Sequence, residues 1–459
     1  MPASRTRTTG AAALLAAALL LPAGAVGAAG PETLVVAQDP FDVAAHDLAG
    51  DGIGNGDLYT WIAPATAEDG RTGTIVSEHQ VVHMPTEGPY AEVRIGTSVL
   101  DLGDGDTIAF AGLIPVTTPL GQIEPGTELV NAIIGGTGAF GGAKGEIRSV
   151  RGEDGAWTHT LTYETAGPGG TEAAARYSFG PGAVREFVEL TGDGETGAGD
   201  FRTFRGSDTT DDGLTVDRNG LQTVIRSAGD DGSNAIAFGI SMEVIGGDLV
   251  VAITALEVTE TGVAATDVTA ALVGGTGRFA GARGSATLSR GDDGPLAMTY
   301  DLLDAPADTV ERTLVLRSGL EAENAIEELL QQLDALRPVD RGDAGASLGD
   351  HRSWMLPFVG DDGEAGVAYG YDIVVKPASD EDPVRTVAGL TVIEFSDGST
   401  IVVGDRHHEG AMADPAEAFV PRPVLGGTGR YAGVSGELVP SFDGAGGLVH
   451  TLTLQGPAA

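Results

Sequence analysis

The sequence predicts an all-β protein of three tandem antiparallel domains, with one helix between the second and the third. Three observations lead to this prediction: a glycine motif that occurs three times, short segments of alternating polarity separated by turn residues, and one stretch with helical periodicity. The composition agrees, because 71 of the 459 residues are glycine, about twice the usual frequency, without a collagen-like triplet. The length also suits about three domains.

Residues 1–29 have the pattern of a secretory signal peptide. Arg5 and Arg7 precede an apolar run from Ala11 to Leu21, and small residues typical of a cleavage zone follow through Ala29. The run is too short to span a membrane, and no other segment reaches about 18 apolar residues. We therefore expect a secreted, extracellular protein that has no membrane anchor after signal removal.

The glycine motif defines the repeat. It reads GGTGAFGGAKG at 135–145, GGTGRFAGARG at 274–284 and GGTGRYAGVSG at 426–436, so successive copies begin 139 and 152 residues apart. A Gly-Asp-Gly motif lies upstream at 50–52 and 192–194, with a weaker echo at 360–363. It precedes the Gly-Gly pair by 85, 82 and 66 residues, which indicates a shortened third copy. These spacings predict domains at 30–168, 169–310 and 342–459, with a linker at 311–341.

Within each copy, polarity alternates with a period of two, which is typical of strands that have one buried face. Clusters of Gly and Asp at 103–106, 291–294 and Ser-Asp-Gly at 396–398 separate these segments as turns. Many short antiparallel strands per copy favour a sandwich or a closed barrel. The segments expected as strands include 74–77, 107–110, 157–163, 249–256 and 389–395.

One segment has the periodicity of a helix. Ser318 and Glu321 form a capping box, apolar residues from Ile326 to Leu336 form one stripe, and Arg337-Pro338 ends it. It lies between the second and third copies. A packed linker helix is the favoured interpretation, and a helix that docks a partner is the alternative.

The glycine motif also matches a dinucleotide-binding fingerprint, because Gly136, Gly138 and Gly141 have its spacing. A true fingerprint continues into a helix whose N-terminus faces the pyrophosphate. Here the residues that follow, 145–150 and 284–288, have strand character instead. The third glycine is also replaced by Ala280 and Ala432 in the other copies. Nucleotide binding is therefore excluded.

The motif resembles a signature of the dirigent and allene oxide cyclase family, which residues 274–284 match nearly in full. Residues 56–61 and 199–204 are similar to the second strand of that family. The resemblance covers most of each copy and depends on this one specific motif. It implies antiparallel eight-stranded barrels with an apolar cavity. Family members are commonly trimers, so the resemblance also implies a monomeric pseudo-trimer of three linked barrels.

The resemblance implies a site of two carboxylates and one basic residue around the cavity in each of the first two copies. The third copy has Pro357, Phe419 and Ser435 at the corresponding places, so we expect activity in the first two. The second carboxylate lies seven residues before the Gly-Gly pair rather than the family's usual five, an offset that keeps the strand face but moves the group along the barrel. The candidate catalytic residues are Asp47, Glu128 and Lys144 in the first copy and Glu189, Asp267 and Arg283 in the second.

The resemblance implies a small apolar or phenolic ligand that the barrel binds, and that it cyclises, isomerises or orients without a cofactor or a metal. One carboxyl group would donate a proton and one carboxylate would stabilise a developing cation. The alternative is a non-catalytic extracellular module with plugged barrels. A roomy apolar pocket that holds inward carboxylates favours chemistry, whereas a barrel filled by large side chains favours a scaffold.

Composition excludes several other classes. A net charge of −40 repels phosphate backbones and anionic membranes, so we expect no nucleic-acid partner. The chain has no cysteine, which excludes disulfides, thiol catalysis and thiolate metal sites.

Three weaker constellations have a structural and a functional interpretation each. Aspartates in Gly-rich loops suit Ca²⁺, but ordinary exposed turns are favoured for Asp51, Asp57, Asp193 and Asp200. The Asp-Arg-His-His-Glu run at 405–409 offers metal-type ligands, but a solvated loop is favoured. His79 and His83 are four apart on a strand-like segment, so we expect them to share one face, in a pocket or on a half-exposed sheet.

Overall fold

The structure is a computed structural model. It describes residues 31–48, 50–86, 88–117, 123–165, 175–179, 183–188, 197–210, 212–229, 231–259, 262–263, 267–290, 296–303, 309–318, 347–378, 384–410, 420–443 and 447–457. Over these residues the chain is all-β apart from three single-turn 3₁₀ helices, at Gly138–Phe140, Gly277–Phe279 and Gly429–Tyr431. No helix in this part of the chain is long and apolar enough to cross a bilayer. The all-β prediction is confirmed.

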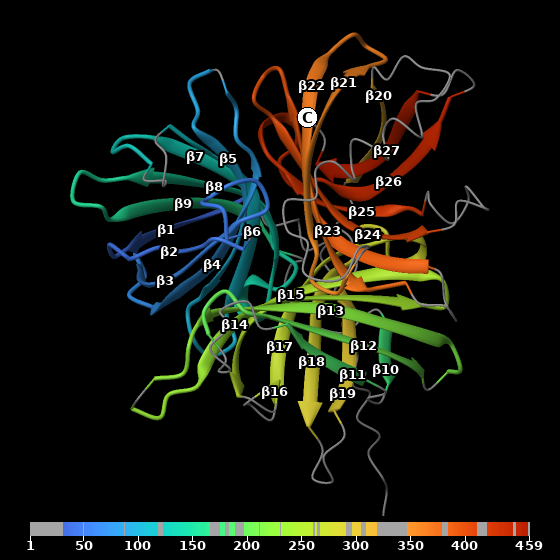
Figure 1. Ribbon diagram of the computed structural model, residues 1–459, viewed down its shortest axis with the longest axis horizontal. Coiled ribbons are helices and arrows are strands. Elements are labelled where there is room, and N and C mark those ends of the chain that lie inside the picture. Colours follow the sequence, from blue (N-terminus) through green and yellow to red (C-terminus); the bar gives the residue numbers. More distant parts are fainter. Residues whose placement is uncertain are drawn as a thin grey trace, which may run out of the picture.

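The first unit is a closed eight-stranded antiparallel barrel, hereafter barrel 1. Strands β3 to β9 form a continuous sheet, and β1 pairs with both β9 and β3 to close it, while β2 adds to β3 outside the ring (Figure 1). The strands are β1 (Glu32–Gln38), β2 (Ala44–His46), β3 (Leu58–Ala67), β4 (Thr72–His83), β5 (Glu92–Asp101), β6 (Thr107–Val116), β7 (Glu128–Gly136), β8 (Lys144–Arg151) and β9 (Trp157–Glu164).

The second unit, sheet 2, has the same strand order, but in its described residues the two end strands, β10 and β11, are not paired with each other. Its strands are β10 (Ala175–Phe179), β11 (Ala183–Val188), β12 (Phe201–Thr209), β13 (Thr215–Arg226), β14 (Ala235–Ile245), β15 (Asp248–Thr259), β16 (Gly262–Val263), β17 (Asp267–Gly275), β18 (Arg283–Arg290) and β19 (Leu296–Leu303).

The third unit, barrel 3, is again a closed eight-stranded barrel. Its strands are β20 (Thr309–Ser318), β21 (His351–Gly360), β22 (Ala365–Lys376), β23 (Val384–Phe395), β24 (Thr400–Gly410), β25 (Arg422–Gly427), β26 (Ser435–Phe442) and β27 (Leu448–Pro457). The five segments expected as strands all lie within described strands. Two closed barrels and a third related sheet are therefore shown.

The expected boundary between the second and third copies is wrong. Residues 311–318, assigned above to a linker, belong to β20, which pairs along its whole length with β27. The expected linker helix beyond Ser318 lies outside the described residues. The third copy is also not shortened, because the counterpart of Asp57 and Asp200 is Asp350 and not the run at 360–363, which forms the turn between β21 and β22.

The three aspartates share one local geometry. The carboxylate of Asp57 accepts the N–H of Gly54 at 2.6 Å, that of Asp200 accepts the N–H of Gly197 at 2.6 Å, and that of Asp350 accepts the N–H of Ser347 at 2.6 Å. Because an Asp side chain that bonds a nearby backbone N–H fixes a tight turn, each copy enters its second long strand in the same way. The third copy keeps the Gly-Asp pair, at 349–350, and has Ser347 where the others have glycine.

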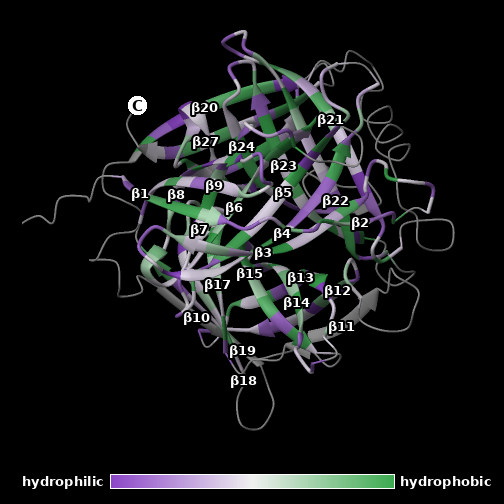
Figure 2. Ribbon diagram, turned by 90° about the vertical axis from the view of Figure 1, so that its left-hand side faces the viewer, coloured by the Kyte–Doolittle hydropathy of each residue, from purple (hydrophilic) through white to green (hydrophobic). Residues whose placement is uncertain are grey.

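The three units pack around a common apolar core rather than standing as separate beads (Figure 1). Strand β5 of barrel 1 is buried along nearly all of its length, whereas β9 alternates between buried and exposed residues. A strand buried on both faces has neighbours on both sides, and here one face lines the barrel while the other contacts the other units. Figure 2 shows apolar and polar segments interleaved along the strands. The common core includes Val76, Ile95, Ala132, Ile134, Leu221, Phe238, Val251, Val273, Tyr371, Leu390, Val402 and Leu425.

The repeated glycine motif forms a bend between two strands in each unit. These are β7 and β8 in barrel 1, β17 and β18 in sheet 2, and β25 and β26 in barrel 3. Its second glycine is required within each unit, because a Cβ on Gly136 would lie 2.5 Å from the carbonyl oxygen of Phe140. Gly138 has φ +58°, a conformation that favours glycine. A single 3₁₀ turn and then strand β8 follow, so the continuation is a strand, as expected from the sequence.

Candidate functional site

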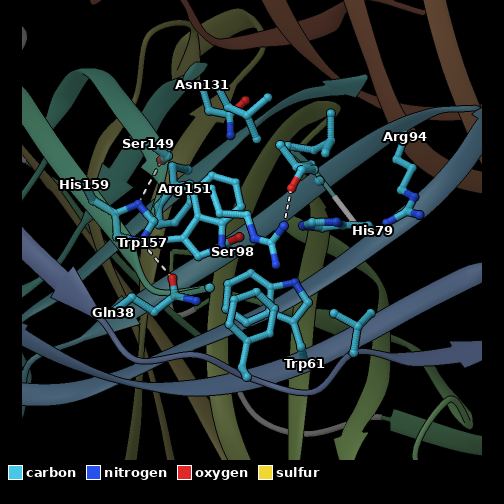
Figure 3. Close-up of a pocket in the computed structure, with 18 residues that line it drawn as sticks. Gln38, Trp61, His79, Arg94, Ser98, Asn131, Ser149, Arg151, Trp157 and His159 are labelled. Carbon is cyan, nitrogen blue, oxygen red and sulfur yellow. Dashed lines mark hydrogen bonds between the residues drawn. The ribbon is translucent and has the colours of Figure 1, made fainter. Parts of the chain in front are cut away.

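Barrel 1 contains a cavity of about 100 Å³ in its interior (Figure 3). Its wall combines aromatic and aliphatic side chains with neutral polar groups and two arginines. Among the described residues, the lining includes neither Asp nor Glu. They are Gln38, Phe41, Val43, Trp61, His79, Arg94, Gly96, Ser98, Phe110, Ile114, Ile123, Leu129, Asn131, Ser149, Arg151, Gly155, Trp157 and His159.

Strand alternation places these side chains inside. Successive residues of a strand point to opposite faces, so Leu129 and Asn131 of β7 share the inner face, as do Trp157 and His159 of β9. Two inward glycines let bulky polar neighbours enter. A Cβ on Gly112 would lie 2.3 Å from Oδ1 of Asn131, and one on Gly96 would lie 3.0 Å from the ring of His79.

Three of the lining side chains form a hydrogen-bonded chain. Nδ1 of His159 lies 2.8 Å from Oγ of Ser149, and its Nε2 lies 2.7 Å from Oε1 of Gln38 (Figure 3). An amide oxygen only accepts, so Nε2 of His159 donates and Nδ1 accepts the Ser149 hydroxyl. The chain therefore runs from Ser149 through His159 to Gln38, and it leaves the N–H bonds of the Gln38 amide as its free end.

Several buried polar atoms of the lining have no hydrogen-bond partner among the residues that the structure describes. They are Nε2 of Gln38, Oδ1 of Asn131 and Nε of Arg94. All three residues are at most 5% exposed. Burying such atoms without a partner costs about 1–3 kcal/mol each. The wall of the cavity thus contains two donors and one acceptor whose hydrogen-bonding capacity is unmet among the described residues.

Aromatic rings form one wall of the cavity. Phe41 and Trp61 stack with ring centroids 4.3 Å apart, and the edge of the Trp61 ring meets His79 at 6.0 Å. Trp157 lies parallel to His159 at 6.3 Å. Such rings supply large apolar area with preferred stacking geometries, so this wall suits a flat, partly apolar molecule.

The titratable groups of the cavity are tuned by burial. Burial, with the charge of Arg94 as a second cause, lowers the pKa of His79 to about 3, and burial lowers the pKa of His159 to about 4. Both imidazoles are therefore neutral at neutral pH. Arg94 forms an ion pair with Glu92, and its guanidinium carbon lies 3.6 Å from the ring centroid of Tyr59. The cavity is thus lined by neutral polar groups with a compensated guanidinium at its edge.

The structure places none of the described sequence-predicted residues in this lining. Glu128 is exposed and pairs with Arg148 at 2.9 Å, because it lies on the face of β7 opposite to Leu129 and Asn131. Asp267 is likewise the exposed first residue of β17. Asp47 is exposed and accepts the backbone N–H groups of the loop at 50–52.

The two predicted basic residues are buried, but between the units. Nζ of Lys144 contacts main-chain carbonyls of all three units, and Arg283 points to the carbonyl of Gly142 at 3.5 Å. Glu189 lies outside the described residues. The expected set of two carboxylates and a basic residue around one cavity is therefore not what the described residues form.

The structure also places the histidine pair and the loop aspartates that the sequence analysis singled out. His79 points into the cavity, but His83 points outward to within 6.3 Å of the ring of Tyr369, because a β-bulge after Val81 shifts the register. The same-face prediction was wrong for that reason. Asp57 and Asp200 are buried and accept backbone N–H groups, so they are neither exposed turns nor open to a cation, while Asp51 is exposed in its turn. Asp193 lies outside the described residues.

The run at 405–409 is not a solvated loop but part of β24. Asp405 and His407 point into barrel 3, where a ligand atom of each lies within 4.8 Å of the other and of one from Asp372. Each carboxylate already has a guanidinium partner, Arg422 on Asp405 at 2.8 Å and Arg352 on Asp372 at 3.0 Å. Burial alone would raise the pKa of Asp405, but Arg422 and His407 lower it to about 2. We interpret this group, the barrel 3 ion network, as an internal plug rather than a metal centre.

Sequence reasoning missed Gln38, Asn131, Ser149 and His159. A signal was present, since His159 falls on the apolar side of the alternation Trp157, Leu161, Tyr163 in a segment already assigned as a strand. A polar residue on a buried face needs a partner, and that rule points to the cavity. The pairing of His159 with Gln38, 121 positions away, has no local signal.

Comparisons with known proteins leave the family open. No protein-family model matches the chain, and no curated protein matches it. Among solved structures, a chain described as "Pyocyanin demethylase" aligns over 29% of this chain and 98% of its own length, at 20% identity and a TM-score of 0.23. Pseudomonas aeruginosa OccK11 (OpdR) and OccK9 (OpdG) align over 94% and 93% of this chain, and over 96% and 97% of their own, each at 9% identity, with TM-scores of 0.12 and 0.11.

Proposed function

We propose that barrel 1 binds a small, flat, apolar or phenolic molecule that carries both a hydrogen-bond acceptor and a donor. The observation that carries this proposal is the pair of unpartnered atoms in the lining, Nε2 of Gln38 and Oδ1 of Asn131. The first requires an acceptor on the ligand, such as a carbonyl or phenolate oxygen. The second requires a donor, such as a hydroxyl group.

The size and wall of the cavity support the same class of ligand. A cavity of about 100 Å³ is of the same order as the engineered apolar cavity of about 150 Å³ that holds one benzene molecule. Trp61, Phe110 and Trp157 provide apolar surface for a ring, and the polar chain ending at Gln38 provides orientation. This combination is typical of small-molecule sites.

Binding and orientation have more support than conversion of the ligand. An acid–base mechanism of the kind implied by the family resemblance needs inward carboxylates, and the described part of the lining has none. The two imidazoles, with pKa values of about 3 and 4, are weak bases at neutral pH. Cyclisation or isomerisation would therefore depend on confinement and hydrogen bonding rather than on proton transfer.

For barrel 3 the scaffold alternative has a specific observation in its favour. Its interior holds the barrel 3 ion network at the level where barrel 1 has the cavity. We further propose that sheet 2 closes as a third barrel by pairing of β10 with β12, as β1 pairs with β3 in barrel 1, since β10 and β11 occupy the ends that β1 and β2 occupy there. The whole would be a secreted pseudo-trimer in one chain, and a light-scattering mass of one chain rather than three is the expected result.

Calorimetric titration with three matched compounds tests the ligand proposal. We expect 4-hydroxyacetophenone, which has a donor and an acceptor, to bind more tightly than acetophenone, and acetophenone more tightly than toluene. Gln38→Leu should abolish the advantage of acetophenone over toluene, and Asn131→Leu the advantage given by the hydroxyl group. Gln222→Leu, the same change in sheet 2, is the control and should change nothing. Equal binding of the three compounds by the unsubstituted protein would refute the proposal.

Intrinsic fluorescence locates the site. The chain has three tryptophans, and two of them, Trp61 and Trp157, line the cavity. A Trp354→Phe variant should keep the full response to a bound ligand. A Trp61→Phe/Trp157→Phe variant, which retains only Trp354 of barrel 3, should lose it. A response that follows Trp354 would move the binding site out of barrel 1.

A further inference from the structure

The ammonium group of Lys144 lies where main-chain carbonyls of all three units converge. Nζ is 2.6 Å from the carbonyl oxygen of Ile134, 2.7 Å from that of Val273 and 2.6 Å from that of Leu425. Each of these three residues stands directly before the Gly-Gly pair of its own unit. The contact is therefore made at equivalent positions of the repeat, on a pseudo-threefold axis.

The first glycine of each motif brings these carbonyls together. A Cβ on Gly135 would lie 2.9 Å from Cγ1 of Val273, one on Gly274 would lie 2.9 Å from Cδ2 of Leu425, and one on Gly426 would lie 3.1 Å from Cγ2 of Ile134. The order is cyclic: unit 1 packs on unit 2, unit 2 on unit 3, and unit 3 on unit 1. Any side chain at these glycines would push the strands apart. The first glycine of each repeated motif thus permits close packing at the axis rather than forming the wall of a cavity.

In two of the units, a glutamate at the same position of the repeat hydrogen-bonds the glycine bend of a neighbouring unit. A carboxylate oxygen of Glu146 in barrel 1 accepts the N–H of Gly429 in barrel 3, and one of Glu437 in barrel 3 accepts the N–H of Gly277 in sheet 2. The corresponding residue of sheet 2 is Ser285, which is too short to repeat the contact. These contacts show independently that the motif joins neighbouring units.

The axis has room for one cation. The positions that correspond to Lys144 are Arg283 and Ser435. Arg283 points instead to the carbonyl of Gly142. Three lysines here would place three like charges within a few ångströms, which repel strongly in a buried setting. A chain that carries the three units in tandem can use a different residue in each, and only one of them supplies an ammonium group.

The donor set matches a protonated amine. Lys144 is 2% exposed. Burial and the charge of Arg283 lower its pKa well below the usual value, whereas hydrogen bonds from the ammonium group to three carbonyl oxygens favour the charged form. A neutral amine has two N–H bonds, whereas an ammonium group has three, one for each carbonyl. Three neutral carbonyl oxygens are ligands suited to a single positive charge of this size.

We propose that the pseudo-threefold axis is a binding site for one monovalent ammonium-type cation, formed by main-chain carbonyls of all three units and filled in this chain by Lys144. Removing the lysine side chain leaves the carbonyls in place and opens the channel that the side chain occupied. A free alkylammonium ion then takes the same position. The three units are held at their axis by this cation, whichever molecule supplies it.

The test is chemical rescue of Lys144→Ala in the full chain, followed by the thermal unfolding midpoint, Tm. Without additive, Tm should fall by several degrees, because three buried carbonyls lose their donor. n-Propylammonium chloride, whose three carbons and nitrogen match the atoms that the substitution removes, should restore at least half of the loss. Tetramethylammonium chloride at equal concentration has no N–H and should restore none. Equal effects of the two salts would overturn the proposal.

Two further variants keep the test decisive. Lys144→Met fills the channel with an apolar side chain of similar length, so it should have a lower Tm than the unsubstituted protein and should not respond to n-propylammonium. A Tm equal to that of the unsubstituted protein would show that the cation is dispensable, and this outcome also decides the question if Lys144→Ala fails to fold. Lys376→Ala removes the other of the two lysines and should change neither Tm nor the response to either salt.

Discussion

Barrel 1 and barrel 3 have the same eight strands and the same bend, yet one encloses a cavity and the other a network of ion pairs. The difference lies in one layer of inward positions. The strand registers align His79 with Asp372, Gly112 with Asp405, and Asn131 with Arg422. Barrel 1 has small or neutral residues there, whereas barrel 3 has charged side chains that form ion pairs, Arg422 with Asp405 and Arg352 with Asp372.

The comparison shows that the same barrel fold accepts either neutral or charged side chains in this layer. The apolar layers beside the bend are similar in both barrels, with Phe140 in barrel 1 and Tyr431 in barrel 3 at the same place. Function therefore depends on a few substitutions in one layer. Changes that exchange the character of the two layers should show which properties belong to the scaffold and which to the cavity.

The largest effect should come from breaking the barrel 3 ion network. Arg422→Met leaves the carboxylate of Asp405, which is 1% exposed, without its closest guanidinium. Removing one partner of a buried ion pair typically costs about 3–5 kcal/mol, and the free energy of unfolding from denaturant titration should fall by that amount. Arg148→Met is the matched control, because its pair with Glu128 is half exposed and should be worth less than about 1 kcal/mol. Similar losses for the two variants would contradict the distinction between a plug and a surface pair.

The next effect concerns pH and the neutral imidazole of barrel 1. The pKa of His159 is lowered from 6.5 to about 4, so between these pH values the unfolded chain binds a proton that the folded chain does not. Stability from this group is present above pH 6.5 and is lost as pH falls. Between pH 7 and pH 5 the loss should be about 2 kcal/mol smaller in His159→Met than in the unsubstituted protein, measured by denaturant titration at both pH values.

Glu78 changes the pH dependence of stability in the opposite direction, so the measurement has to compare two proteins that both contain it. Burial raises its pKa from 4.5 to about 7, so the folded chain holds the extra proton and stability falls as pH rises through this range. Glu78 lies on the outer face of barrel 1 and is present both in the unsubstituted protein and in His159→Met. Its contribution to the pH dependence of stability therefore cancels in the difference between the two. A pH dependence that His159→Met leaves unchanged would show that this imidazole is not held neutral.

A third change converts the polar chain of barrel 1 into the lining of sheet 2. The registers align Ser149 and His159 with Leu288 and Met298. The double variant Ser149→Leu/His159→Met should reduce affinity for 4-hydroxyacetophenone at least about tenfold, or about 1.4 kcal/mol, since Gln38 loses the partner that orients it. Stability at pH 7 should stay level or rise, because apolar groups replace buried polar ones. Retained affinity would exclude the chain from Ser149 to Gln38 as part of the site.

The sequence was sufficient for the all-β class, the threefold repeat and the strands, because period-two alternation and glycine bends are local signals. It was misleading at the third copy, where the run at 360–363 resembled the Gly-Asp-Gly motif more than the true counterpart at 347–350 does, and where most of β20 was assigned to a linker. It also placed Lys144 at a cavity, because nothing local distinguishes a bend that faces a neighbouring unit from one that faces an interior.

The candidate site was predicted least well, and the reason is parity and long-range pairing. Counting back from the Gly-Gly pair selected Glu128, one residue from the inward position of Leu129, and a one-residue difference on a strand reverses the face. The bulge after Val81 reversed it again at His83. Partners such as Gln38 and His159 meet only because the barrel closes between β1 and β9, which no spacing in the sequence reveals.

The smallest effect should come from the outward carboxylates. If inward neutral residues and not outward acids distinguish barrel 1, then Glu128→Gln and Asp267→Asn should leave ligand affinity unchanged within error. Their stability should change by less than about 0.5 kcal/mol, as expected for exposed positions. The informative comparison is Glu128→Gln beside Asn131→Leu, which lie three residues apart on β7 but on opposite faces. Titration of both with 4-hydroxyacetophenone should show a loss of affinity for Asn131→Leu alone, and a loss for Glu128→Gln would return the carboxylate pair to the site.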